Sequence, residues 1–292
     1  MIKFLLTAIV INLLLFSTNY AHTPTPNTIL MCLDGISRNT FYALIQKNRL
    51  PNIAKIIKRG NYRNMEAVNP SGETLPSYVE LITGYNLNIP EPKNKFTIPE
   101  NLTIFEKLKQ AIPDLEIGII LSTPQNLDNP VTLTPLFSNL PTTSYTFYPE
   151  IPRSDSITAK DAVSFINTQT NNSKPFFLFL NFTDTDFIGH RYREGAASYS
   201  QSIKNCDLAI GKIINYLENK GIWNNTNFFI TTNYGFTPKT NSHKGENKIW
   251  ITSSCKIRFK GTLINIAPTI YHIYGLEPKT ITPALIGKSL VY

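Results

Sequence analysis

Polar side chains able to bind a metal ion or to act in ester chemistry follow several apolar runs of this 292-residue sequence. Each run has the composition of a buried β-strand, and the polar residues come where the run stops. In chain order these residues are Asp34, Asp184, Asp186, His190, Asn233 and Tyr234. Because ligands of open α/β sheets gather where strands end, we expect these side chains to meet at one edge of a sheet.

Two further residues could join this edge. Thr74 opens a segment of helical period with Pro76 in its first turn, and we expect Thr74 to be the N-cap of that helix. A hydroxyl there lies at the positive end of the helix dipole. His243 lies in the polar segment after Tyr234. Carboxylates, two histidines and a hydroxyl could therefore converge on one face.

The elements that must position these residues alternate between strand and helix. Strands are expected at 28–33, 62–68, 116–121, 143–148, 175–182, 227–232 and 248–253, and helices at 39–46, 50–60, 74–84, 161–169, 199–221 and 264–275. This succession predicts an α/β fold, namely a three-layer α/β/α sandwich with a mostly parallel central sheet. The run 175–182 is almost wholly apolar, as strands buried on both faces of a parallel sheet are.

The first 21 residues predict export. Lys3 precedes an apolar run at 4–16, which is too short to span a bilayer comfortably and is typical of a secretory signal peptide cleaved after Ala21. We expect residues 22–292 to form the mature domain, periplasmic or secreted, with no transmembrane span after cleavage. An uncleaved membrane anchor is the alternative.

Charge and cysteine content narrow the class of partner only slightly. The net charge of +8 favours an anionic partner, but the lysines are scattered and no arginine-rich stripe indicates a nucleic-acid-binding module. Cys32 and Cys206 fall in strand and helix patterns and are expected to be buried thiols. The spacing of these two residues and Cys255 is not that of metal ligands. A single disulfide among the three is the alternative to free thiols.

Several stretches, in a common order, make the chain similar to the alkaline phosphatase superfamily, near its type I phosphodiesterase/nucleotide pyrophosphatase and sulfatase-like branches. They are LMCLDGISRNTFYALIQKNRLPNIAKIIKRG at 30–60, TLPSYVELITG at 74–84, DFIGH at 186–190, and NIAPTIYHIYGL at 265–276 followed by GKSL. The resemblance implies an alkaline phosphatase-like fold with a reduced cap. Residues 86–150 match least and would form a variable cap-like region that selects the substrate.

The resemblance also implies a metal centre. Two zinc-type ions in such enzymes neutralise the oxygens of the transferred group and activate the nucleophile. One ion would be bound by Asp186, His190 and His243. The other would be bound by Asp34 and by Thr74, which takes the place of the family's nucleophile.

The second of these sites departs from the family pattern. An Asp-His pair would complete it, but this sequence has Asn233 and Tyr234 at those positions, and neither is a normal zinc ligand. Tyr78, where sulfatases have Arg, and Asn265, where the family usually has Asp, are further departures. We therefore expect one firmly bound divalent ion, zinc in the simplest case, rather than two.

Two functions follow from these patterns. The first is an exported metal-dependent hydrolase of phosphate mono- or diesters that attacks a small anionic substrate with a threonine nucleophile. The alternative is a catalytically impaired pseudoenzyme of the same fold that binds an anionic ligand or a partner protein. The joint presence of the residues matching both metal sites favours the hydrolase, and the Asn233-Tyr234 pair favours the alternative. The oligomeric state is left open.

Overall fold

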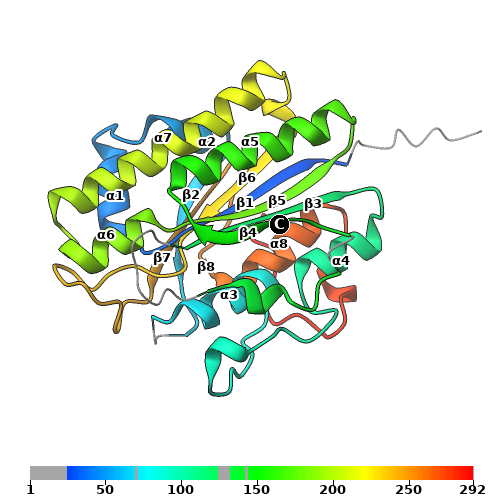
Figure 1. Cartoon of the computed structure of the whole chain (residues 1–292), viewed down its shortest axis with the longest axis horizontal. Helices are drawn as coiled ribbons and strands as arrows, with labels where there is room; N and C mark the ends of the chain where they lie inside the picture. The colour runs from blue at the N-terminus through cyan, green and yellow to red at the C-terminus, as the bar shows by residue number, and fades with distance from the viewer. Residues whose placement is uncertain (1–24, 70–71, 124–131, 142–143, 292) are drawn as a thin grey trace, which may run out of the picture.

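An eight-stranded sheet passes through the centre of the molecule, with helices on both of its faces (Figure 1). The computed structural model describes residues 25–69, 72–123, 132–141 and 144–291. The predicted signal peptide at 1–21 lies outside the described residues. None of the helices in the described ranges is long and apolar enough to cross a membrane.

The order of the strands in the sheet is β4-β3-β5-β1-β6-β7-β2-β8. Their bounds are β1 Asn27–Leu33, β2 Asn61–Glu66, β3 Glu116–Thr123, β4 Thr146–Pro152, β5 Phe176–Phe182, β6 Thr226–Thr231, β7 Lys248–Ser253 and β8 Gly261–Thr262. Among these described strands, β7 alone runs antiparallel to its neighbours β6 and β2. The predicted mostly parallel central sheet is confirmed.

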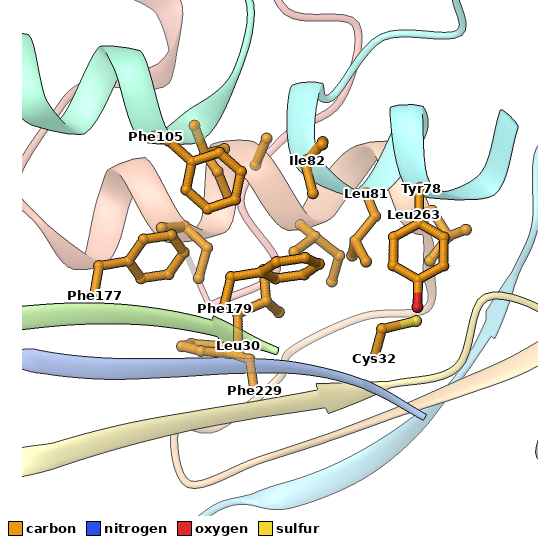
Figure 2. Close-up of a cluster of buried hydrophobic side chains, with 14 of the residues drawn as sticks. Leu30, Cys32, Tyr78, Leu81, Ile82, Phe105, Phe177, Phe179, Phe229 and Leu263 are labelled. Carbon is orange, nitrogen blue, oxygen red and sulfur yellow. The ribbon is translucent and has the colours of Figure 1, made fainter. Parts of the chain in front are cut away.

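The three central strands β5, β1 and β6 are apolar because both of their faces are buried. Leu30 of β1 pairs with Phe179 of β5 and with Phe229 of β6, and these side chains enter one hydrophobic core (Figure 2). Their neighbours along each strand, Ile29, Leu178 and Phe228, enter a second core on the other face. Alternation of side chains along a strand thus places the sheet between two apolar layers.

Two helical layers cover these faces. One contains α1 Arg38–Gln46, α2 Pro51–Arg59, α5 Asp155–Asn171, α6 Asp184–Tyr192 and α7 Ala197–Asn219, and the other contains α3 Thr74–Thr83, α4 Ile104–Ala111 and α8 Ile266–Ile273. The three-layer α/β/α architecture predicted from the sequence is confirmed. All three cysteines are free thiols, and Cys32 and Cys206 are buried as expected.

The structure also corrects several elements. The strand predicted at 143–148 begins at Thr146, and α4 and α6 were not predicted. The start of α4 is a capping box, in which Thr103 and Glu106 bond each other's backbone N–H groups, a signal visible in the sequence. Residues 86–150 contain α4, β3 and the start of β4, which belong to the sheet and its covering layer. That this region acts as a cap and selects the substrate stays a prediction.

Candidate active site

The polar residues that follow the central strands meet at one edge of the sheet. Asp34 comes after β1, Asp186 lies in the first turn of α6 after β5, and Asn233 and Tyr234 come after β6. These strands are adjacent and parallel, in the order β5-β1-β6, so that their carboxyl ends lie together. The turn after β1 contacts α6 closely, because a Cβ atom added at Gly35 would lie 2.6 Å from Asp186 Oδ1.

Asp186, His190 and His243 form a compact group whose ligand atoms all lie within 4.8 Å of one another. Asp186 and His190 stand one turn apart on α6, and His243 reaches them from the loop after β6. His243 Nε2 lies 3.1 Å from Asp186 Oδ1 and 3.0 Å from His190 Nε2. The structure thus brings together the three residues predicted to hold the first ion.

Backbone carbonyls orient both imidazole rings. His243 Nδ1 lies 2.6 Å from the Gly235 oxygen, and His190 Nδ1 lies 3.0 Å from the Asn241 oxygen. A carbonyl oxygen can only accept, so both Nδ1 atoms carry the proton in the neutral rings and both Nε2 atoms present lone pairs. Asp186 Oδ1 is buried and lacks a hydrogen-bond donor among the described residues.

These facing acceptors fit a divalent cation. Two imidazole nitrogens and a carboxylate are a common donor set for zinc, and carbonyls that fix the outer nitrogen of each ring are typical of metal-binding histidines. Their surroundings also leave room for a ligand. An open cavity of about 730 Å³ is lined by His190 and His243, together with Asn69, Gly72, Asn241, Ser242, Lys244 and Gly245.

The packing of α6 explains why it contains a glycine at position 189. Gly189 precedes the candidate ligand His190, and the Phe236 ring lies against this glycine, so that an added Cβ atom would come within 2.3 Å of that ring. Phe236 also contacts both histidine rings, with centroid distances of 5.1 Å to His190 and 4.0 Å to His243. Glycine is therefore required for the helix to approach the loop that carries His243.

Thr74 lies at the start of α3, but not as predicted. The N-cap is Glu73, so the interpretation of Thr74 as the N-cap is wrong, and Thr74 is the first helical residue. Its hydroxyl is 2.6 Å from the Tyr234 hydroxyl. The Thr74 hydroxyl thus bonds a side chain from another segment, whereas an N-cap hydroxyl would bond an N–H group of its own helix. The residue still lies in the first turn, near the positive end of the helix dipole.

Tyr234 connects Thr74 to the three-residue group of Asp186, His190 and His243. Its buried ring lies 4.0 Å from the His243 ring, centroid to centroid, while its hydroxyl contacts Thr74. Burial, and then the negative charges of Asp186 and Asp34, raise the pKa of Tyr234 well above its ordinary value. The phenol therefore stays neutral in the physiological range.

Asp34 has a partner that the sequence did not predict. Its buried carboxylate accepts a hydrogen bond from the Tyr78 hydroxyl. Burial, followed by the charge of Asp186, raises the pKa of Asp34 well above its ordinary value. The only signal for this contact was the spacing of Tyr78, four residues after Thr74 on the same face of α3.

Asn233 turns its oxygen toward the backbone. Asn233 Oδ1 accepts the N–H groups of Gly35 and Tyr234 at 3.3 Å and 2.9 Å. Its Nδ2 is buried without a hydrogen-bond partner in the described part of the chain. Asp184 does not join the group either, because its carboxylate accepts the Asp155 N–H at 3.0 Å.

The second set of residues therefore does not fit a metal ion. It comprises Asp34, Thr74, Asn233 and Tyr234. The Asn233 oxygen is already bonded, the free atom of its amide is a donor, and the phenol of Tyr234 retains its proton. Neither of these two residues offers the anionic oxygen or imidazole nitrogen that a zinc site requires.

Comparison with known proteins identifies the family. The model of the type I phosphodiesterase/nucleotide pyrophosphatase family matches residues 119–283, more than half of the chain. The chain belongs to this family. It lies within the alkaline phosphatase superfamily, as predicted from the sequence.

Curated relatives match over shorter stretches. Human bis(5'-adenosyl)-triphosphatase ENPP4 is 28% identical over 116 residues, which are 39% of this chain and 24% of that protein. The 2,3-bisphosphoglycerate-independent phosphoglycerate mutase of Clostridium kluyveri is 27% identical over 148 residues, 46% of this chain and 27% of that protein. The chain therefore spans about a quarter of the length of the curated relatives it matches.

Solved structures share the fold along most of the chain. The lipoteichoic acid synthase LtaP of Listeria monocytogenes superposes with a TM-score of 0.65 at 13% identity, covering 91% of this chain and 76% of that one. Alkaline phosphatase from the Antarctic bacterium TAB5 gives a TM-score of 0.59 at 14% identity, covering 87% and 99%. These likenesses establish an alkaline phosphatase-like fold for this member of the family.

The carboxyl group of Glu80, on α3, should make the stability of the fold depend on pH. It is 1% exposed and accepts the Val68 N–H at 3.3 Å, and burial raises its pKa from 4.5 to about 7. The folded state therefore binds this proton more tightly than the unfolded state. Its contribution to stability is full below about pH 4.5 and is lost as the pH rises to about 7.

We expect Glu80→Gln to remove this dependence. Between pH 4.5 and pH 8, the unfolding free energy of the wild type should fall by on the order of 2 kcal/mol more than that of the variant. This difference is smaller than the full shift in the pKa of Glu80 would give. Urea denaturation of both proteins at several pH values measures the difference. Parallel profiles would show that Glu80 is ionised at no cost in the folded state.

Proposed function

We propose that this chain hydrolyses phosphate mono- or diesters, with one divalent cation held by Asp186, His190 and His243 and with Thr74 as nucleophile. The observation that carries the proposal is the convergence of three metal-binding atoms, all acceptors, beside a helix that begins at a threonine. Tyr234 contacts both parts, so the hydroxyl and the cation site belong to one centre. Family membership supports the same reaction class.

The chemistry divides between the cation and the protein. When bound, the cation would stabilise negative charge on the oxygens of the phosphoryl group. Thr74 Oγ forms a bond to phosphorus as the bond to the leaving oxygen breaks, and the hydroxyl proton passes through solvent to that leaving oxygen. Water then cleaves the bond between phosphorus and Oγ, and a proton from this water restores the Thr74 hydroxyl. The positive end of α3 stabilises the threonine oxygen as it loses its proton. The Tyr234 hydroxyl fixes the direction of the Thr74 hydroxyl through their 2.6 Å contact.

The donor atoms of the proposed site and the residues around it limit the choice of metal and of substrate. Two imidazoles and one carboxylate favour zinc among divalent cations. Lys244 lines the same open cavity as His190 and His243, and it suits an anionic substrate. The name of the human relative makes bis(5'-adenosyl) triphosphate one candidate. The leader-like sequence at 1–21 supports export to the periplasm or the exterior.

A second candidate function is a pseudoenzyme that binds an anionic ligand or a partner protein without turnover. Two observations favour it specifically. Asn233 and Tyr234 replace the metal-binding pair expected there, and Tyr78 occupies an oxygen of Asp34. A centre with one cation provides less charge stabilisation in the transition state than a centre with two.

An assay separates the two candidates. Purified protein is incubated with zinc or manganese and with a phosphate monoester, a phosphodiester, bis(5'-adenosyl) triphosphate and a sulfate ester, and Thr74→Ala prepared identically controls for contaminating enzymes. The proposal predicts zinc-dependent turnover of at least one phosphate ester that the variant lacks. Phosphate binding without turnover of any ester would establish the pseudoenzyme, and turnover confined to the sulfate ester would contradict the proposed substrate class.

A further inference from the structure

We infer that the phenols of Tyr78 and Tyr234 take the place of a second cation and that Tyr234 positions the nucleophile through a hydrogen bond. The inference rests on the proposed role of Thr74 as nucleophile. It assigns a role to two tyrosines for which the chemistry of a two-metal centre has no use. We call Tyr78 and Tyr234 the tyrosine pair.

The hydrogen bond from Tyr78 stabilises the buried Asp34 carboxylate in place of a cation. The Tyr78 side chain is fully buried, Asp34 is 5% exposed, and the phenol donates a hydrogen bond to Asp34 Oδ1. A buried carboxylate requires a cation or strong hydrogen-bond donors, and this bond supplies a charge-assisted donor. The phenol therefore competes with any cation for the oxygen Oδ1 of Asp34.

The fold holds Tyr78 firmly in this position. Its ring makes an edge contact with Phe179 of β5, with centroids 6.3 Å apart. Figure 2 shows its hydroxyl directed from α3 toward Cys32, near the end of β1 that leads to Asp34. Because the ring packs in the core and only the oxygen reaches the carboxylate, the contact is part of the packed structure.

The other phenol of the tyrosine pair, Tyr234, lies between Thr74 and His243. Its hydroxyl bonds Thr74, and its ring packs on His243, which is a proposed ligand of the single cation. The phenol can donate to or accept from the threonine, but it carries no positive charge. It therefore holds the direction of the Thr74 hydroxyl, a task that a metal–oxygen bond would otherwise perform.

Asn233 completes a set built for hydrogen bonds. Its oxygen is bonded to the N–H groups of Gly35 and Tyr234, and its free atom is the buried donor Nδ2. The set thus has an amide N–H group and a phenol at the two positions where metal ligands would be needed, and a second phenol bonded to Asp34 itself. A strong second cation site therefore requires changes at all three positions.

Zinc titration tests the first part of the inference. Calorimetry and metal analysis are applied to the wild type, to Asn233→Asp/Tyr234→His, and to the triple variant that adds Tyr78→Phe. We expect one zinc ion per chain in the wild type and two in the triple variant. The double variant should bind its second ion at least about ten-fold more weakly than the triple variant, because Tyr78 still competes for Asp34.

Each outcome has a distinct meaning. Two zinc ions in the wild type would overturn the inference but leave the proposed hydrolase standing, whereas no zinc in the wild type would overturn the proposed one-cation centre itself. A folded triple variant that still binds only one ion would also overturn the inference. The number of zinc ions bound by the wild type tests the inference even if the triple variant does not fold.

Kinetics of Tyr234→Phe test the positioning role, because this variant keeps the ring on His243 and removes only the hydroxyl. We expect kcat to fall about ten-fold with KM and zinc content unchanged, the effect of one lost hydrogen bond on the reacting oxygen. Tyr85→Phe is the matched control, since it removes a hydroxyl that bonds the Pro283 carbonyl. Equal kcat values in the two variants would overturn the role of Tyr234.

Discussion

Replacing Thr74 by alanine is expected to lower the turnover of phosphate esters at least about a thousand-fold, as removal of a nucleophile does in enzymes whose catalytic groups act as a unit. The unfolding free energy should change by only about 1 kcal/mol. The reason is that Thr74 is not the N-cap of α3, and the described hydrogen bond of its side chain is the one to Tyr234. Turnover and urea denaturation are measured on the same preparation.

Thr74→Ser provides the control for this prediction. Serine retains the hydroxyl at the start of α3, and we expect the variant to keep turnover within about ten-fold of the wild type. Substantial turnover by the alanine variant would exclude Thr74 as nucleophile and indicate direct attack by water. Inactivity of the serine variant would indicate that the methyl group, and not the hydroxyl, is what the centre requires.

The second large effect concerns the cation. His190→Ala should weaken zinc binding at least about a hundred-fold, because a centre with three protein ligands cannot easily lose one. The exposed side chain of His190 contributes little to the hydrophobic core, so the variant should fold normally. Equilibrium dialysis against zinc followed by metal analysis measures the loss.

A histidine outside the centre serves as the comparison. His272 lies on α8, which covers the opposite face of the sheet, and His272→Ala should retain zinc as the wild type does. Equal retention by both variants would mean that His190 is not a ligand. Asp186→Asn should reproduce the loss, because it removes the only carboxylate of the three-residue group.

The fold was predictable in segments whose composition and hydrophobic period are compatible with only one type of secondary structure. The almost wholly apolar run 175–182 became β5, and the ordered strand ends predicted that Asp34, Asp186 and Asn233 would meet. Helix α6 was missed because its start, Asp184 to Asp186, follows β5 without an intervening loop and contains few apolar residues. The sequence motif showed the spacing of Asp186 and His190 but not that a helix produces it.

The direction of side chains was beyond the reach of the sequence. The residue types at Asn233 and Tyr234 predicted a poor second metal site, but not that the Asn233 oxygen bonds the backbone or that Tyr234 reaches Thr74. Tyr78 was compared only with the residue that relatives have there, and its contact with Asp34 depends on how α3 packs on the sheet. Such contacts arise from tertiary packing, which a local pattern does not encode.

One consequence of this arrangement is a local balance of charge. Asp34 and Asp186 lie close enough that the charge of Asp186 raises the pKa of Asp34. In a centre with two cations, each carboxylate would face its own metal ion. Here the cation would balance Asp186, and the phenol of Tyr78 stabilises Asp34 without adding charge.

Anomalous diffraction at the zinc edge, from crystals of the wild type grown with zinc, tests the central claim most directly. The account predicts one peak per chain, within bonding distance of Asp186, His190 and His243, and no peak beside Asp34 and Thr74. A second peak between Asp34 and Thr74, or an absence of density among the three proposed ligands, would contradict it.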